Sequence, residues 1–136
     1  MDIQIFKLNA KDIEKFKQLI LVFEEIFEMT NFLLPEEKYL IQLLMRDDFF
    51  VFVAVADNKV VGGLTAYTLQ QYYSVSPLVF IYDIAIRTDA QRQGVGKRLI
   101  SHLTNYCKDN NFEEMFVLAD EADDHAIEFY RSTGAT

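Results

Sequence analysis

Residues 78–86, LVFIYDIAI, are apolar along their whole length except for one charged residue, Asp83. A strand with one face in water alternates apolar and polar residues, whereas a strand covered on both faces does not alternate. The segment therefore predicts a central strand with helices packed on both of its faces.

Hydrophobic periodicity predicts the remaining elements. Apolar residues recur at three- and four-residue steps over 10–28, which predicts a long helix with Phe27 on its inner face. Pro35 suits the first turn of a second helix, with Tyr39 on its inner face. The expected elements are strands over 2–8, 49–56, 60–70, 78–86 and 114–119, helices over 10–28, 35–45 and 95–110, and a short helix from Asp123 or Asp124 to Gly134. This order, β-α-α-β-β-β-α-β-α, predicts a single mixed α/β domain over residues 1–136.

Local signals add detail to the strands. We expect Ile3, Ile5 and Leu8 of the first strand to face one side. Asp57-Asn58-Lys59 predicts a hairpin turn between two antiparallel strands. Gly62-Gly63, inside the second of these strands, predicts a bulge or a close approach of backbone.

The balance of charges narrows the function. The chain has 136 residues with 13 Lys+Arg against 21 Asp+Glu, a formal net charge of −8. Nucleic-acid binding depends on clustered Lys and Arg, so we expect no nucleic acid and a cationic partner instead. The one cysteine, Cys107, cannot form an internal disulfide, which favours a reducing cytoplasm. No apolar run approaches the ~18 residues of a membrane span, and the two histidines lack further ligands at metal spacing, so neither membrane nor metal is expected.

A loop with two glycines, Gln91-Arg92-Gln93-Gly94-Val95-Gly96, joins the central strand to the next helix. The first amides of a helix have no intrahelical acceptor, and the helix dipole places about half a positive charge there. Glycine lets the backbone approach an anion, and Arg92 and Lys97 add positive charge, so the loop predicts a phosphate site. An ordinary turn between strand and helix accounts for the same string equally well.

Two motifs resemble those of the GNAT family of acetyl-CoA-dependent N-acetyltransferases. One is the loop, of the family form [Arg/Gln]-x-x-Gly-x-[Gly/Ala] after a strand of the type IYDIAI, and the other is Phe129-Tyr130-Arg131-Ser132-Thr133-Gly134. The resemblance implies the GNAT fold, a twisted and mostly antiparallel central sheet flanked by helices, with acetyl-CoA as co-substrate. The chain stops at Thr136, where the family normally continues into one or two strands, so we expect these strands to be missing and a homodimer to cover the sheet edge.

The resemblance also assigns residues to the coenzyme. Amides of the central strand would hold the acetyl carbonyl, and the loop would hold the diphosphate. Asp123 stands where many relatives have an asparagine that contacts the pantetheine arm. The expected coenzyme-binding residues are Ile84, Ala85, Ile86, Gln91, Arg92, Gln93, Gly94, Val95, Gly96, Lys97, Asp123 and Tyr130.

Within the family, the stretches 81–85, 92–94 and 119–126 resemble the small bacterial aminoglycoside 3-N-acetyltransferases. This likeness implies direct acetyl transfer, in a ternary complex, to the 3-amino group of a polycationic antibiotic. Two alternatives stay open: an acetyltransferase for a polyamine or peptide amine, and a coenzyme-binding module without turnover.

Two side chains are expected to move protons. A primary amine with a pKa near ~10.4 must lose a proton before it can attack the thioester. Asp83 is the expected base, because a lone carboxylate in an apolar strand is costly unless it faces a cleft or a cation. The alternative is a structural carboxylate bonded to backbone amides. Tyr130 resembles the family's general acid, which protonates the departing thiolate, and its alternative role is that of a core tyrosine.

Further carboxylates are expected to attract the cationic acceptor. The expected substrate-binding residues are Asp83, Asp120, Glu121 and Asp124, the last three in a cluster that also contains Asp123. We expect Glu36, Glu37, Asp47 and Asp48 to face the same mouth. Such a rim raises the local concentration of a polyamine. A solvated helix start has the same composition, and that interpretation also stays open.

Overall fold

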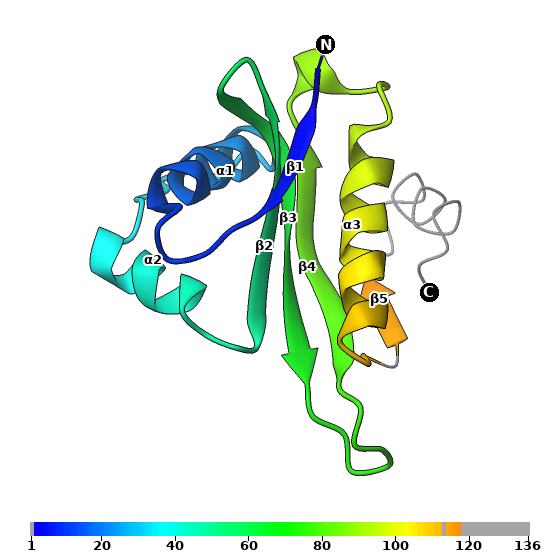
Figure 1. Ribbon diagram of the computed structural model, residues 1–136. Coiled ribbons are helices and arrows are strands. Elements are labelled where there is room, and N and C mark those ends of the chain that lie inside the picture. The colour runs from blue at the N-terminus through cyan, green and yellow to red at the C-terminus, as the bar shows by residue number, and fades with distance from the viewer. Residues whose placement is uncertain (1, 113, 118–136) are drawn as a thin grey trace.

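The computed structural model describes residues 2–112 and 114–117 (Figure 1). The described elements are β1 (Gln4–Lys7), α1 (Ile13–Ile26), α2 (Glu37–Leu44), β2 (Phe49–Ala56), β3 (Lys59–Leu69), β4 (Leu78–Ile86), the 3₁₀ turn η1 (Thr88–Ala90), α3 (Val95–Asp109) and β5 (Glu114–Val117). The bounds of β2 and β4 are those expected from the sequence. The expected helix between Asp123 and Gly134 lies outside the described residues.

The described strands form one sheet in the order β1-β2-β3-β4-β5. Neighbouring strands from β1 to β4 pair antiparallel, and β4 pairs parallel with β5 from Leu78 opposite Glu114 to Ile81 opposite Val117. Helices α1 and α2 cover one face of this sheet and α3 covers the other (Figure 1). The expected mixed α/β fold with a mostly antiparallel sheet is confirmed.

Each face of the sheet has its own hydrophobic core, because strand residues alternate between the two faces. On the α3 face, Leu99, Ile100 and Leu103 of the helix are fully buried against Leu64 and Ile81 of the sheet. The core under α1 and α2 is built by side chains that are buried against the opposite face: Phe16, Leu19, Val22, Phe23, Leu40, Leu44, Phe49, Val51, Val53, Val60 and Ala85. The central strand β4 therefore has helices on both sides.

Two glycines in β3 let backbone segments approach closely. The pairing shifts from Ala54–Gly62 to Val55–Val60, which leaves Val61 as the extra residue of a bulge. A Cβ on Gly62 would lie 2.8 Å from the Ala85 carbonyl oxygen, and one on Gly63 would lie 2.5 Å from the Phe52 carbonyl oxygen. The close approach expected as one of two alternatives at this pair is confirmed, and a bulge lies directly before the pair, at Val61.

The β2–β3 turn follows its local chemistry. Asp57 and Asn58 both have positive φ, 51° and 64°. Two central residues with positive φ define the type I′ turn, whose twist matches that of the flanking strands, and Asn and Asp are among the residues that tolerate it.

Helix α1 begins at Ile13, three residues later than expected. The Asp12 carboxylate accepts a hydrogen bond from the Asn9 amide (2.8 Å), and the Asn9 side chain accepts one from the Lys11 amide (2.8 Å). These short-range bonds stabilise a turn over the residues expected to form the first helical turn. At the other end the helix stops at Ile26, and Glu28 takes a positive φ of 52°.

Three expectations about where side chains lie were wrong. Phe27, beyond the end of α1, is 43% exposed and stacks on Phe23 instead of entering the core. Tyr39, in the first turn of α2, is 52% exposed. Leu8 lies in the core under α1 and α2, whereas Ile3 and Ile5 pack in the α3-side core, because Leu8 stands an odd number of positions after both isoleucines and strand alternation therefore places it on the opposite face.

Candidate active site

A bulge in β4 determines where Asp83 points. Thr65 pairs with Asp83 and Ala66 pairs with Ile81, so Tyr82 is the extra residue. Ile81 and Ile84 both pack in the α3-side core. Regular alternation from Ile81 would place Asp83 on that same face, but the inserted residue reverses the alternation. Asp83 therefore lies on the face covered by α1 and α2.

The Asp83 carboxylate is half-buried, and burial raises its pKa above the ordinary value. Among the described residues, no hydrogen bond or ion pair holds this carboxylate. The expected alternative, a structural carboxylate bonded to backbone amides, has no such bond in this part of the chain. A half-buried acid without a protein donor is suited to accept a proton from a cationic ligand.

Two tyrosines lie near Asp83: Tyr82 precedes it in β4, and Tyr67 of β3 is close enough for the carboxylate to affect its pKa. The rings of Tyr67 and Tyr82 meet edge to face with 5.6 Å between their centroids. Burial raises the pKa of Tyr67 most, followed by the nearby phenols of Tyr82 and Tyr39 and by the Asp83 carboxylate, whereas Arg46 lowers it. Side chains of α2 and β4 therefore lie near the Tyr67 hydroxyl of β3.

Thr65 lies beside Asp83 on the neighbouring strand. Its side chain is 6% exposed, and its Oγ1 atom has no hydrogen-bond partner among the described residues. Sequence reasoning did not identify Thr65, Tyr67 or Tyr82 as site residues. Their link to Asp83 depends on the bulge at Tyr82, which the apolar pattern of the strand does not reveal.

The upper end of β4 leads through η1 to the N-terminus of α3 (Figure 1). Gly94 precedes the helix with a φ of 76°, and a Cβ added there would meet nothing within 4 Å. The Gln91 side chain donates a hydrogen bond to the Ile86 carbonyl (2.9 Å) and fixes the loop to the end of the strand. Gln93 reaches back more weakly to the Asp89 carbonyl (3.5 Å).

The first turn of α3 is open to an anion. The first amide that bonds back to the loop is that of Arg98, which donates to the Gly94 carbonyl (3.1 Å). Within residues 2–112 and 114–117, no acceptor binds the amides of residues 95–97. This turn contains no acidic residue. Free amides, a glycine in the left-handed region and the absence of a carboxylate fit a diphosphate group.

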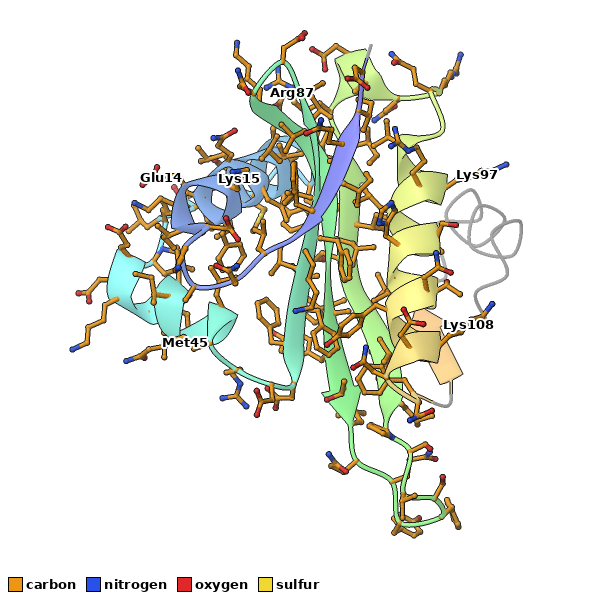
Figure 2. The ribbon with its side chains drawn as sticks, viewed as in Figure 1. Glu14, Lys15, Met45, Arg87, Lys97 and Lys108 are labelled. Carbon is orange, nitrogen blue, oxygen red and sulfur yellow. The ribbon has the colours of Figure 1, made fainter. Side chains whose placement is uncertain are left out.

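The charged side chains of this loop lie at its outer surface. Arg92 is exposed and takes a positive φ of 64°. Lys97 is exposed and projects from α3 away from the sheet (Figure 2). Val95 and Gly96 are buried and anchor the first turn against the core. Both charged side chains are therefore exposed beside the open turn in sequence, and the space at Gly94 holds no protein atom within 4 Å of an added Cβ.

Residues 84–86 continue β4 beyond its described pairing with β5, which ends at Ile81 opposite Val117. Ile84 and Ile86 pack toward α3, and Ala85 is buried toward α1. The segment leads directly from Asp83 to the loop before α3. Of the other expected site residues, Asp120, Glu121, Asp123, Asp124 and Tyr130 lie outside the described residues.

Two of the acidic side chains near α2 are paired with cations. Arg46 donates two hydrogen bonds to the Asp48 carboxylate, at 2.8 and 2.9 Å, and lowers its pKa. Lys17 lies 3.6 Å from Glu37. Asp47 acts on Tyr106 of α3, whose pKa is raised first by burial and then by Cys107 and Asp47. Glu37 and Asp48 are thus paired with cations, and a common mouth faced by Glu36, Glu37, Asp47 and Asp48 stays a prediction.

Other chemistry-bearing groups stay outside this site. Cys107 is buried in the α3-side core, and burial raises its pKa to about 11, so its thiol is protonated at neutral pH. The described residues contain no group of three or more His, Cys, Asp and Glu side chains that could hold a metal ion. Among the helices described, none is long and apolar enough to cross a membrane.

Residues 16–135 match the model of the acetyltransferase (GNAT) family. The match extends over most of the chain, so the protein belongs to this family. The crystal structure of aminoglycoside acetyltransferase meta-AAC0020 from an uncultured soil metagenomic sample, in complex with sisomicin, is similar at 50% identity and a TM-score of 0.93. The comparison covers 96% of this chain and 86% of that one.

More distant proteins agree with the family. Aminoglycoside acetyltransferase HMB0005, from an uncultured soil metagenomic sample, is 27% identical with a TM-score of 0.93, covering 100% of this chain and 93% of that one. The histone acetyltransferase GCN5 of Oryza sativa subsp. japonica is 30% identical over 105 residues, 76% of this chain. The chain spans only 19% of the length of that curated relative.

Proposed function

We propose that this acetyltransferase modifies an amine of an aminoglycoside, at its 3-amino group, with acetyl-CoA as donor. The observation that carries the proposal is the 50% identity to an aminoglycoside acetyltransferase crystallised with sisomicin, over 96% of this chain. The formal net charge of −8 supports a polycationic acceptor. The proposed position of the acetylated amine rests on the resemblance of the stretches 81–85, 92–94 and 119–126 to the small bacterial aminoglycoside 3-N-acetyltransferases.

The GNAT family uses acetyl-CoA, and the loop before α3 fits its diphosphate. In the proposal, amides of residues 94–97 donate to the diphosphate oxygens, and Arg92 and Lys97 add positive charge. Gln91 and Gln93 hold the loop in shape through their bonds to Ile86 and Asp89. Asp123 would contact the pantetheine arm. Bound acetyl-CoA would supply an activated acetyl group as a thioester.

Asp83 is the proposed base. At neutral pH an aminoglycoside amine is largely protonated, so a proton must leave before the nitrogen can attack. The half-buried carboxylate would accept this proton on the face under α1 and α2. Amides of residues 84–86 would donate to the acetyl oxygen as negative charge develops there, and Tyr130 would give a proton to the departing sulfur. Asp120, Glu121 and Asp124 would bind the other ammonium groups of the acceptor.

A peptide amine is the second candidate acceptor, favoured by the 30% identity to a histone acetyltransferase. The class of amine that the protein acetylates distinguishes an aminoglycoside acceptor from a peptide acceptor. Thiol release from acetyl-CoA should be measured with sisomicin, spermidine and a lysine-containing peptide, with Asp83→Asn as the control for base-dependent turnover. Turnover with sisomicin in the native chain supports the proposal, turnover only with the peptide supports the second candidate, and coenzyme binding without any turnover contradicts both.

We also propose that the protein acts as a homodimer in the cytoplasm. The physical argument is general: an edge strand of a sheet attracts further pairing, and a second copy of the chain would cover such an edge. Light scattering of the purified chain tests the assembly: twice the 15.8 kDa mass of the chain is expected, and a monomer across the working concentration range contradicts the dimer.

A further inference from the structure

Two neighbouring polar side chains on the α1 and α2 face lack the partners that they need. Thr65 and Asp83 stand opposite each other in the β3–β4 ladder. Directly paired residues of antiparallel strands point to the same face, with Cβ atoms about 4.5–5.5 Å apart. Among residues 2–112 and 114–117, the Thr65 hydroxyl has no hydrogen-bond partner and no donor holds the Asp83 carboxylate.

Because Thr65 is buried, few groups can form a hydrogen bond with its hydroxyl. The residue is 6% exposed and its Oγ1 atom is sealed from solvent. An unsatisfied buried hydroxyl costs about 1–3 kcal/mol, so native proteins rarely retain one without a reason. A substrate cannot reach this oxygen from solvent. The group best placed to accept its hydrogen bond is therefore the paired side chain, Asp83.

We propose that Thr65 is a positioning residue: when Asp83 is ionised, the Thr65 hydroxyl turns to donate a hydrogen bond to the carboxylate and holds it in place for proton transfer. A threonine hydroxyl changes direction by rotation between staggered side-chain conformations, which requires no movement of the backbone. The proposal rests on the proposed role of Asp83 as base, and it adds a second residue that tunes that base.

The groups near Asp83 do not mask the effect of such a hydrogen bond on its pKa. Burial is the cause that raises the pKa of Asp83, and no charged side chain of α1, α2 or β3 shifts it among the residues described. The titratable neighbours on this face are the phenols of Tyr67 and Tyr82, and Asp83 acts on the pKa of Tyr67. A hydrogen bond to the ionised form lowers the pKa of a carboxyl group, so Thr65 would oppose the effect of burial.

Carboxyl ¹³C NMR titration of the intact chain tests the bond directly, with the Asp83 signal assigned through Asp83→Asn. Thr65→Val keeps the shape of the side chain but removes the donor, and should raise the pKa of Asp83 by about half to one unit. Thr65→Ser keeps the donor and should leave the pKa unchanged. Thr68→Val, on the same strand opposite Val79, controls for a general effect of the substitution.

The acid limb of kcat/KM for sisomicin should move upward by the same amount in Thr65→Val and stay in place in Thr65→Ser. If Thr65→Val does not fold, Thr65→Ala carries the same expectation. An unchanged or lowered Asp83 pKa in the variant without the hydroxyl would overturn the inference. Full turnover in Asp83→Asn would instead overturn the base assignment, and the NMR titration would still decide whether the hydrogen bond exists.

Discussion

Substitution of Gly94 should affect stability and coenzyme binding through two different causes. Its φ of 76° lies in the left-handed region, yet an added Cβ would meet no protein atom within 4 Å. Gly94→Ala therefore strains the backbone without creating a clash inside the chain. The new methyl group would stand in the open space before the α3 amides, where the proposal places the diphosphate.

The two effects have different magnitudes. A non-glycine residue in the left-handed region costs about 1–2 kcal/mol, whereas asparagine tolerates this region better. For a domain of this size, each kcal/mol lowers Tm by about 3–5 °C. Losing one hydrogen bond to a charged group costs about 1.5–3 kcal/mol, which corresponds to about a 10- to 100-fold weaker affinity. Gly94→Asn should thus recover much of the stability lost in Gly94→Ala, but both should bind acetyl-CoA poorly.

Thermal unfolding followed by circular dichroism gives the stability, and calorimetric titration with acetyl-CoA gives the affinity. Both variants should show Kd values raised by at least about tenfold, with Gly94→Ala the less stable of the two. Native affinity for acetyl-CoA in both folded variants would refute the placement of the diphosphate at this turn.

Three further results are expected. Burial raises the pKa of Asp83, so the contribution of this residue to stability is fully present below the unfolded pKa and is lost as pH rises through the folded pKa. Asp83→Asn should therefore raise Tm at neutral pH, and this increase should disappear below about pH 4. The same substitution should lower kcat at least about 100-fold. A lower Tm at neutral pH would contradict this sign. In the β2–β3 turn, Asn58→Ala should lower the free energy of unfolding by about 1 kcal/mol and Asn58→Gly should change it by less than about 0.5 kcal/mol, measured by urea titration; equal losses would show that the positive φ is not the cause. The KM for sisomicin should rise with sodium chloride concentration if carboxylates attract the acceptor, and a KM independent of salt would remove that role.

The sequence predicts best where the signal is local. The apolar runs at 49–56 and 78–86 gave the bounds of β2 and β4, and Asp57-Asn58 gave the turn after β2, because both depend on a few adjacent residues. The predicted start of α1 was three residues too early, although the interactions that delay the helix are also local. Asn9 and Asp12 suit a helix cap and a turn equally, and here their side chains stabilise the turn.

The candidate site depends on contacts that the sequence does not contain. Asp83 stood out as a charge among apolar residues, but its face of the sheet is set by the bulge at Tyr82. Thr65 becomes relevant only because it pairs with Asp83 in the β3–β4 ladder, although Asp83 lies eighteen positions further along the chain. The pairing of Arg46 with Asp48 likewise reduces the free negative charge that a count of carboxylates suggests.

The central claim is tested most directly by the structure of the reaction product. The purified chain should be incubated with acetyl-CoA and sisomicin, and the product should be analysed by two-dimensional NMR. The proposed function predicts one new amide, on the 3-amino group, formed at least about 100-fold more slowly with Asp83→Asn. Acetylation at another nitrogen would contradict the assigned position, and unmodified sisomicin beside a chain that binds acetyl-CoA would contradict the proposed function itself.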